Sequence, residues 1–435
     1  MNCRFAVPVR SALSIDELVR VVGTVVSDYE ALRTKYPLDT QGKLTQSVAQ
    51  FGEMQIPIIQ ARQPTTASDA LLEQLADTPF DDELDWPVRF TMIMNGNMPS
   101  ELLVVLSPLS ADWFAESMLR TEIGLRIAGR VQSPSHREAV HPIDRALEEH
   151  SPSVESRSRL ATARWARFVD EFDVTNFPKR LSANRTASRW NIATLRSLDM
   201  ASAALSIAKR CNAGLPAVYH AATAVMISAL SDRPVSVMHN MSANRFSDTD
   251  MACMGRLTQA SAAAVRVSDF TFDEVVQLAS IAGIRSYAMG YYSTPEIDSL
   301  IDADLFDCFH NNIFHNGLRQ RHSADDSLGI DTETGSSGII ECRPLEFSTH
   351  QFAVEVGHRG GQTEMSLLTD RCYLPVAQPD ILLNVFETLI VKSAAAPRAT
   401  PAVKLAQLAL EKPPDVPNCA DRRRRVTDHA ASPRR

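Results

Sequence analysis

Residues 102–119 read Leu-Leu-Val-Val-Leu-Ser-Pro-Leu-Ser-Ala-Asp-Trp-Phe-Ala-Glu-Ser-Met-Leu, and this segment constrains the fold more than any other. Its first five residues are apolar, which predicts a buried strand over Leu102–Leu106. The residues that follow turn tightly and become amphipathic, and Asp112 stands where the N-cap of a helix is expected. A loop between such a strand and helix is a place where catalytic residues can lie.

The rest of the chain alternates between helical and strand patterns. Helices are predicted over residues 16–36, 201–211, 216–230, 272–285 and 381–391. Strands are predicted over 235–241, 260–267 and 304–314, and over 351–368 as a hairpin that turns at Gly360 and Gly361. This order predicts an α/β fold.

Length and composition bound the protein class. A chain of 435 residues that is 44% hydrophobic has enough apolar material for two subdomains. Its apolar runs are far shorter than a membrane span, and its N-terminus lacks the apolar core of a signal peptide, so we expect a cytoplasmic protein. Residues 396–435 carry nine Lys or Arg and four Asp or Glu, which leaves the remaining chain near −13 and argues against nucleic-acid binding.

The motifs of several common enzyme classes are missing from the sequence. Seven cysteines show no spacing typical of a zinc or redox site, and the odd number argues against a complete set of disulfides. No GxxxxGK[ST], GxGxxG or HExxH pattern occurs, so nucleotide hydrolysis and zinc-protease chemistry have little support. We expect no metal and no cofactor bound to this chain.

Segment 102–119 resembles the active-site segment of the condensation domains of nonribosomal peptide synthetases. In that family two histidines, three variable residues, an Asp and a Gly follow a strand. Here Ser107 and Pro108 stand at the histidine positions, Asp112 keeps the Asp, and Trp113 replaces the Gly. The resemblance thus identifies a degenerate form of the motif.

The similarity covers residues 1–395 in order and spacing. Segment 31–36 resembles an early family motif, Trp165 lies in a similar helix, and Asn244-Arg245 followed by Gly255 resembles a later motif. The resemblance implies a standalone protein with two chloramphenicol acetyltransferase-like α/β subdomains, arranged as a V-shaped pseudo-dimer with the site in a central cleft. The N-terminal subdomain is predicted at residues 1–170, the C-terminal one at 171–395, and a disordered basic tail at 396–435.

The resemblance also assigns roles to single residues. The second histidine of the family acts as a general base or positions the substrates, but Pro108 has no titratable or hydrogen-bonding side-chain atom. Ser107 can form hydrogen bonds and is a further catalytic candidate, although an unassisted hydroxyl is a poor base. The family's Asp is structural and pairs with an Arg in the second subdomain, which predicts an ion pair between Asp112 and Arg245.

A relocated base is possible in the strand around residue 310. Side chains two apart share a face, so Cys308, His310 and Asn312 point the same way. By resemblance this strand lines the channel in which the substrates meet, which makes Asn312 and Cys308 channel-lining residues and His310 the best candidate base. The alternative is a hydrogen-bonded structural histidine; the other histidines, His315, His350 and His358, are weaker candidates.

Two functions remain open at this point. In the first, the protein binds an acyl or peptidyl carrier protein whose phosphopantetheine arm holds the intermediate, or recruits a tailoring enzyme to it, as degenerate condensation domains that recruit oxygenases do. In the second, it is an atypical acyltransferase that forms an amide or ester from a carrier-bound thioester, because positioning alone can supply much of such a rate. A Trp113 that plugs the channel favours the first function, whereas a Trp113 that packs into the core does not.

Overall fold

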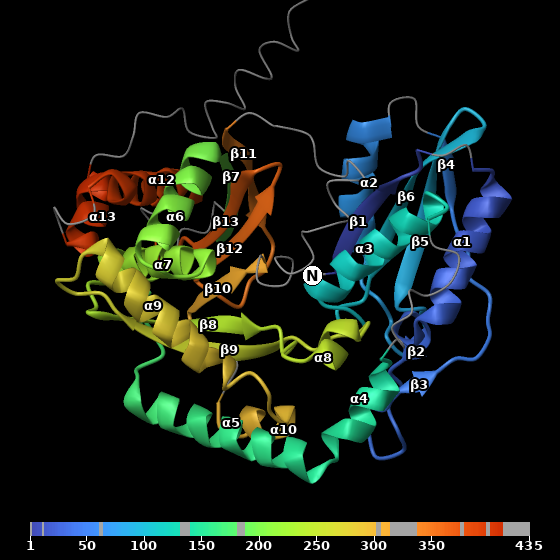
Figure 1. Cartoon of the computed structure of the whole chain (residues 1–435), viewed down its shortest axis with the longest axis horizontal. Coiled ribbons are helices and arrows are strands. Elements are labelled where there is room, and N and C mark those ends of the chain that lie inside the picture. Colours follow the sequence, from blue (N-terminus) through green and yellow to red (C-terminus); the bar gives the residue numbers. More distant parts are fainter. Residues whose placement is uncertain are drawn as a thin grey trace, which may run out of the picture. The chain divides into compact units, whose positions relative to one another are not determined.

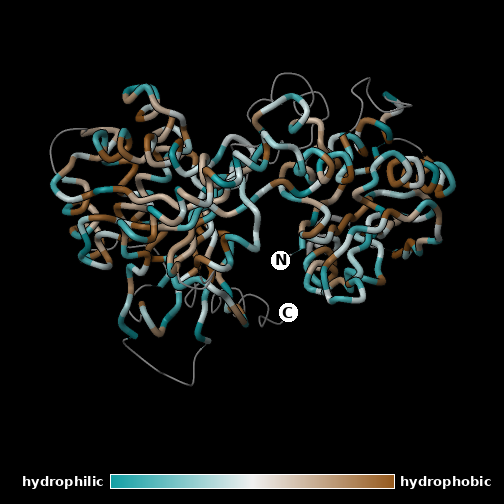
Figure 2. Tube along the Cα trace, turned by 90° about the horizontal axis from the view of Figure 1, so that it is seen from below, coloured by the Kyte–Doolittle hydropathy of each residue, from teal (hydrophilic) through white to brown (hydrophobic). Residues whose placement is uncertain are grey.

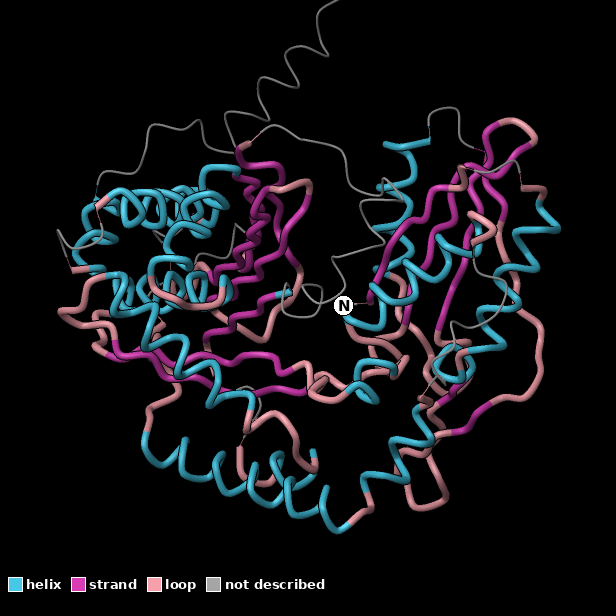
Figure 3. The backbone as a smooth tube through the Cα atoms, in the orientation of Figure 1, coloured by secondary structure: helices cyan, strands magenta, loops and turns pink. Residues whose placement is uncertain are grey.

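The computed structural model describes residues 2–10, 13–60, 64–130, 140–180, 188–301, 306–313, 337–374, 378–396 and 401–411 (Figure 1). They divide into two compact units, each a mixture of helices and strands (Figure 3). Unit 1 takes in Met1–Glu155 and Ala243–Thr258, and unit 2 takes in Ser156–Ser242, Gln259–His315 and Asp331–Arg435. The division falls within α5 (Pro152–Glu171), earlier than the boundary at residues 170 and 171 that the sequence suggests.

Unit 1 is built around a four-stranded sheet in the order β1-β6-β5-β4, with β1 and β5 antiparallel to β6 and β4 parallel to β5. Its strands are β1 (Cys3–Pro8), β2 (Thr34–Lys35), β3 (Ser47–Val48), β4 (Ile58–Gln60), β5 (Val88–Asn95) and β6 (Met98–Leu106). Its helices are α1 (Ile15–Asp28), the 3-10 helix η1 (Glu30–Arg33), α2 (Pro64–Asp77), α3 (Trp113–Ile127), α4 (Pro142–Glu149) and α8 (Asp248–Ala252).

The apolar run in β6 is unbroken because this strand is buried on both faces. Leu102, Val104 and Leu106 point into the core that includes residues of α1 and α3, whereas Leu103 and Val105 point into a second core beside α2. The buried strand predicted at residues 102–106 is therefore confirmed as the C-terminal part of β6.

Unit 2 is built around a seven-stranded mixed sheet in the order β11-β7-β13-β12-β10-β8-β9, in which β10 is parallel to both β12 and β8. Its strands are β7 (Trp190–Ser197), β8 (Val235–Ser242), β9 (Gln259–Arg266), β10 (Cys308–Asn312), β11 (Gly338–Leu345), β12 (Phe352–Arg359) and β13 (Gln362–Asp370). Besides α5, its helices are α6 (Leu198–Arg210), α7 (Leu215–Ser231), α9 (Phe272–Tyr287), α10 (Thr294–Asp298), α12 (Pro379–Ala395) and α13 (Ala402–Glu411).

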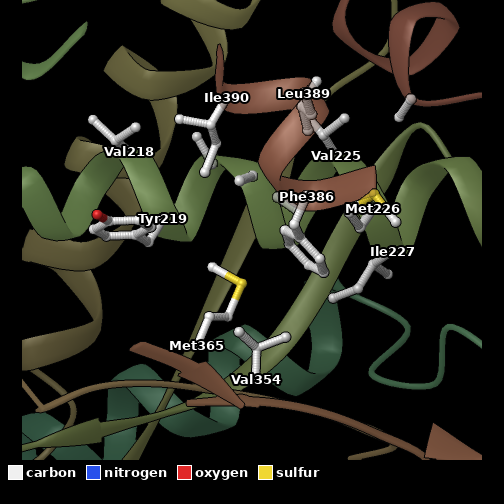
Figure 4. Close-up of a cluster of buried hydrophobic side chains, with 14 of the residues drawn as sticks. Val218, Tyr219, Val225, Met226, Ile227, Val354, Met365, Phe386, Leu389 and Ile390 are labelled. Atoms are coloured by element: carbon white, nitrogen blue, oxygen red, sulfur yellow. The ribbon is translucent and has the colours of Figure 1, made fainter. Parts of the chain in front are cut away.

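Helix α7 forms the centre of the unit 2 core. Tyr219 and Val225 on α7 are fully buried, and Phe386 of α12 packs beside them over Val354 and Met365 of the sheet (Figure 4). The predicted hairpin is confirmed as β12 and β13, and its two glycines have φ of 55° and 78°, which suits a two-residue turn with left-handed residues. In Figure 2 apolar and hydrophilic stretches alternate along both units.

Two sequence expectations need correction. The helix predicted over residues 16–36 ends at Asp28, because Tyr29 is extended and residues 34–35 pair with β3 instead. The tail predicted to be disordered from residue 396 contains α13, because Ala402, Ala406 and Ala409 recur on one helix face and pack into the unit 2 core. The rest of the predicted tail, residues 412–435, lies outside the described residues.

Within the described part of the chain, no single helix combines the length and the apolar character needed to cross a membrane. Helices α6 and α7 meet those criteria only as a pair bent by 106°.

Candidate functional site

Asp112 closes the loop after β6 and is the N-cap of α3. Its Oδ1 accepts a hydrogen bond from the backbone N–H of Ala115 at 2.9 Å, one of the donors that a helix N-terminus leaves unpaired. Its Oδ2 accepts from the backbone N–H of Leu257 at 3.0 Å and from the hydroxyl of Thr258 at 2.8 Å. The side chain is almost completely buried, so these donors replace the water that a carboxylate loses on burial.

Arg245 supplies the charge that balances Asp112. Its Nη2 donates to both carboxylate oxygens, at 3.0 and 3.1 Å, and the two side chains are 2% and 4% exposed. The guanidinium also donates at 2.8 Å to each of three backbone carbonyls, those of Asp250, Cys253 and Gly255. The ion pair that the resemblance implies is therefore present in the structure.

This ion pair anchors a loop, residues 243–258, that lies between β8 and β9 in the chain but packs within unit 1. Met254 of the loop is 1% exposed and belongs to the unit 1 core. Removing one partner of a buried pair typically costs about 3 to 5 kcal/mol. Both oxygens of Asp112 are engaged, so the geometry is that of a structural carboxylate.

Ser107 and Pro108 occupy the turn where the resemblance places the two histidines. The hydroxyl of Ser107 is fully buried and donates to Oδ1 of Asp82 at 2.7 Å. The hydroxyl oxygen of Ser107 accepts from the backbone N–H of Leu109 at 3.3 Å, and the carbonyl of Pro108 accepts from Arg256 at 3.3 Å. These contacts hold the turn, and neither side chain offers a group that titrates near neutral pH.

Trp113 is the first residue of α3 and is only half-buried. The next two residues, Phe114 and Ala115, are 1% and 0% exposed. Trp113 is not among the buried residues that form the described core of unit 1, so it does not pack beneath the helix as one sequence interpretation allowed.

Glu116, one turn beyond Asp112 on α3, is a titratable group that the sequence analysis missed. It is 4% exposed, and burial raises the pKa of its carboxyl to about 7, although Arg120 and Arg4 lower it. Oε1 accepts from Nη2 of Arg120 at 3.0 Å, whereas Oε2 has no hydrogen-bond partner among the described residues. The signal was available, because Glu116 stands between the apolar residues 114–115 and 118–119.

His310 lies on β10 of unit 2 and is 2% exposed. Asn312 donates from Nδ2 to its Nε2 at 2.8 Å, which assigns the ring proton to Nδ1, and Nδ1 is 2.9 Å from the hydroxyl of Thr223. The ring stacks on His220 with a centroid distance of 5.1 Å. Burial, helped by His220, lowers the pKa of His310 well below its usual range.

Cys308, His310 and Asn312 share one face of β10, as predicted, and that face packs against α7. Thr223 belongs to α7, and Asn312 donates to the carbonyl of Pro216 in the same helix at 3.3 Å. Cys308 is fully buried, and burial beside Asp307 raises the pKa of its thiol well above the usual range, which makes it a poor nucleophile. The arrangement is typical of a structural histidine in a packed interior.

The predicted site residues fall into both units. Ser107, Pro108, Asp112, Trp113 and Arg245 belong to unit 1, and Cys308, His310 and Asn312 belong to unit 2. His315 lies outside the described residues. No group of three or more His, Cys, Asp or Glu among the residues with described positions is arranged to hold a metal ion.

Comparison with known proteins identifies the fold. No protein-family model matches the sequence, and no curated protein matches it either. Solved structures do match: the condensation domain from the Monacolin K polyketide synthase MokA has a TM-score of 0.72 and 15% identity, with 93% of each chain covered. The structure concerned with condensation domain-mediated chain release from the enacyloxin polyketide synthase has a TM-score of 0.68 and 13% identity, covering 96% of this chain and 80% of that one.

A third match is the X-domain from teicoplanin biosynthesis, which has a TM-score of 0.66 and 16% identity and covers 92% of this chain and 91% of that one. Such agreement over nearly the whole length, at identities too low to indicate shared chemistry, is agreement of backbone architecture. The chain therefore has the α/β fold of the condensation domains.

Proposed function

We propose that this protein takes a condensation-domain-like part in nonribosomal peptide or related natural-product biosynthesis, and that it acts by binding. In this role it holds an intermediate tethered to the phosphopantetheine arm of an acyl or peptidyl carrier protein, or recruits a tailoring enzyme to it. The fold supports this proposal, since the structures it resembles come from polyketide and peptide synthetases and from an X-domain. We expect the chain itself to need no metal or other cofactor.

The observation that carries the proposal is the state of the turn at residues 107–108. A condensation reaction is accelerated by a group that takes the proton of the attacking amine or hydroxyl as it adds to the thioester carbonyl. Here one position is a proline and the other a buried serine that donates its hydrogen to Asp82. The Asp112–Arg245 pair that stabilises the same loop is complete. Retained structural contacts beside a missing base favour binding over catalysis.

His310 gives little support for a relocated base. A general base has to reach the proton that it removes, and it needs a free lone pair. The Nε2 lone pair of His310 accepts from Asn312, and the ring is 2% exposed. We therefore expect that His310 contributes to folding and not to transfer.

The test uses a carrier protein loaded with an octanoyl or aminoacyl thioester, an amine or alcohol acceptor, and the full-length protein. The thioester is followed by intact mass, and binding to the loaded carrier by co-elution. We expect co-elution without loss of the thioester, with the wild type and with His310→Ala. Transfer that His310→Ala abolishes, while the variant still co-elutes with the carrier, would overturn the binding role.

A catalytic role has one specific observation in its favour, the raised pKa of Glu116. A carboxylate with a pKa of about 7 has the proton affinity that suits a general base near neutral pH. In that case the protein is an atypical acyltransferase: the acceptor loses its proton to the carboxylate, its N or O bonds to the acyl carbon, and the pantetheine thiolate leaves. Glu116→Gln keeps the shape of the side chain, so loss of transfer in this variant alone would establish the second role.

A further inference from the structure

A cavity of about 690 Å³ lies in unit 1 between α1 and the segment from Val48 to Ile56. Its lining includes none of the residues Ser107, Asp112, Arg245 or Glu116, so it is separate from the site considered above. A volume of this size is within the range of pockets that bury a small organic molecule, roughly 300 to 1,000 Å³.

Hydrogen bonds fix the position of the segment from Val48 to Ile56, which is the outer wall of the cavity. Arg33 donates from Nη1 to the carbonyl of Ala49, and the N–H of Ala49 donates to the carbonyl of Arg33, both at 2.9 Å. Farther along the segment, the indole N–H of Trp86 donates to the carbonyl of Glu53 at 2.8 Å. A Cβ on Gly52 would clash with the Trp86 ring, so the backbone of this segment packs closely against that ring. The cavity is therefore formed before any ligand arrives.

Gly23 places no side chain on the floor of the cavity, which is the side formed by α1. It lies in the middle of α1, where glycine is less stable than alanine, and an added Cβ would meet no atom within 4 Å. Packing therefore does not explain the glycine at this position. A glycine that destabilises its helix and leaves open space beside the backbone is typical of a place where a ligand approaches the helix.

The lining combines apolar side chains with polar ones, and its two charged residues have opposite signs. Val22 and Val26 of α1 face the cavity together with Met54 and Ile56 of the outer wall, whereas Phe51, also in the lining, is 91% exposed. Glu30 and Arg33 of η1, which follows α1, also line the cavity and lie 3.6 Å apart, so their charges offset each other. A ligand with a net charge would meet the like charge of one of them, whereas an amide can donate to the carboxylate and accept from the guanidinium.

We propose that this cavity binds an aliphatic acyl chain that ends in a neutral amide, with the chain along α1 and the amide at Glu30 and Arg33. The proposal is independent of the function proposed above, because it concerns a different part of unit 1. Octanoyl-glycinamide combines both features and serves as the probe.

The test titrates N-octanoylglycinamide into the full-length protein and follows calorimetric heat and Trp fluorescence. Two substitutions at one position separate binding from folding. Gly23→Ala adds one methyl group and should raise the melting temperature with less than a threefold change in affinity. Gly23→Phe fills the floor and should keep the melting temperature at or above that of the wild type while it weakens binding at least tenfold.

Two further ligands test the chemistry of the site. N-acetylglycinamide keeps the amide without the chain, and octanoate keeps the chain with a negative charge; each should bind at least tenfold more weakly. The proposal is overturned if the probe does not bind, if Gly23→Phe binds it as the wild type does, or if octanoate binds equally well. Dimerisation in sedimentation without probe binding would make the cavity an interface between two copies, and would overturn it too.

Discussion

The chain buries polar groups at two centres in opposite ways. Around Asp112 in unit 1, a full negative charge is buried and faces an arginine, two backbone N–H groups and a hydroxyl in addition to its helix-cap bond. Around His310 in unit 2, the buried groups are neutral: the imidazole is held by Thr223 and Asn312 and stacks on His220. Neither pattern leaves a reactive atom exposed.

The two centres differ because more hydrogen-bond donors surround the buried carboxylate of Asp112 than surround the buried imidazole of His310. A buried charge is tolerated only when its solvation shell is replaced, which at Asp112 takes contributions from α3 and from the loop at residues 243–258. A histidine can instead give up its charge, so burial lowers the pKa of His220 to about 4 and no counter-ion is needed. Removing a partner should therefore destabilise the structure around Asp112, whereas adding a proton should destabilise the structure around His310.

The largest effect is expected from Asp112→Ala. It removes the N-cap of α3 and leaves the guanidinium of Arg245 buried without its carboxylate, so the free energy of unfolding should fall by about 3 to 5 kcal/mol. Urea denaturation followed by circular dichroism measures this change. Arg256→Ala is the matched control, because Arg256 is exposed in the same loop and should cost no more than about 0.5 kcal/mol.

A double variant distinguishes the cost of the unpaired charge from the cost of lost packing. If Asp112→Ala combined with Arg245→Met is more stable than Asp112→Ala alone, the penalty comes from the unpaired charge. Equal losses in the two variants would mean that the loop is held by its apolar contacts, such as those of Met254, and the contrast between the centres would disappear.

The next prediction concerns the loss of stability at acid pH. In the folded state His220 takes a proton only near pH 4, whereas in the unfolded chain it does so near its ordinary value of 6.5. The unfolded state thus binds more protons between these values, and stability falls as the pH is lowered through this window, by about 3 kcal/mol from His220 alone. His220→Gln cannot titrate, so its unfolding free energy should change less between pH 6.5 and 4. Parallel curves for the two proteins would contradict the prediction.

Glu116 sharpens the comparison, because it is as buried as Asp112 but has fewer donors. Its pKa is raised from 4.5 to about 7, so the folded state binds more protons than the unfolded state between these values. Stability should therefore fall as the pH rises from 4.5 to 7, by about 3 kcal/mol, and stay level above pH 7. In Glu116→Gln this fall should be absent. The control is Glu17→Gln on α1, whose carboxyl is exposed and has a lowered pKa.

The elements with a clear pattern could be read from the sequence. The apolar run of β6, the glycine pair between β12 and β13 and the Asp112 cap each depend on local rules, and all are found in the structure. The ion pair of Asp112 with Arg245 required more, because the two residues are 133 positions apart and only the family resemblance linked them.

The chemistry of the candidate site was harder to predict. Alternation along β10 gave the shared face of Cys308 and His310 but not what covers it, and α7 turned out to pack there. Burial also sets the pKa of Glu116 and of His310, and burial depends on which helices cover a strand. The helix α13 was missed because three alanines carry its contact face, a weak apolar signal within a basic segment.

The smallest effect tests the neutral centre directly. Thr223→Val keeps the shape of a fully buried side chain but removes the hydroxyl that pairs with Nδ1 of His310, so one polar atom is left unsatisfied. The expected loss of stability is about 1 to 2 kcal/mol, less than for Asp112→Ala because no charge is stranded. Thr24→Val on α1 is the control, since its hydroxyl donates to the carbonyl of Arg20 on the exposed side of a helix, and the substitution should change stability by under about 0.5 kcal/mol.

The nitrogen NMR shifts of His310 provide the second measurement, because loss of the Thr223 partner should change the Nδ1 resonance while Nε2, still bonded to Asn312, moves less. If stability and the Nδ1 resonance both stay unchanged, His310 does not depend on this hydrogen bond, and the case for a structural histidine is lost.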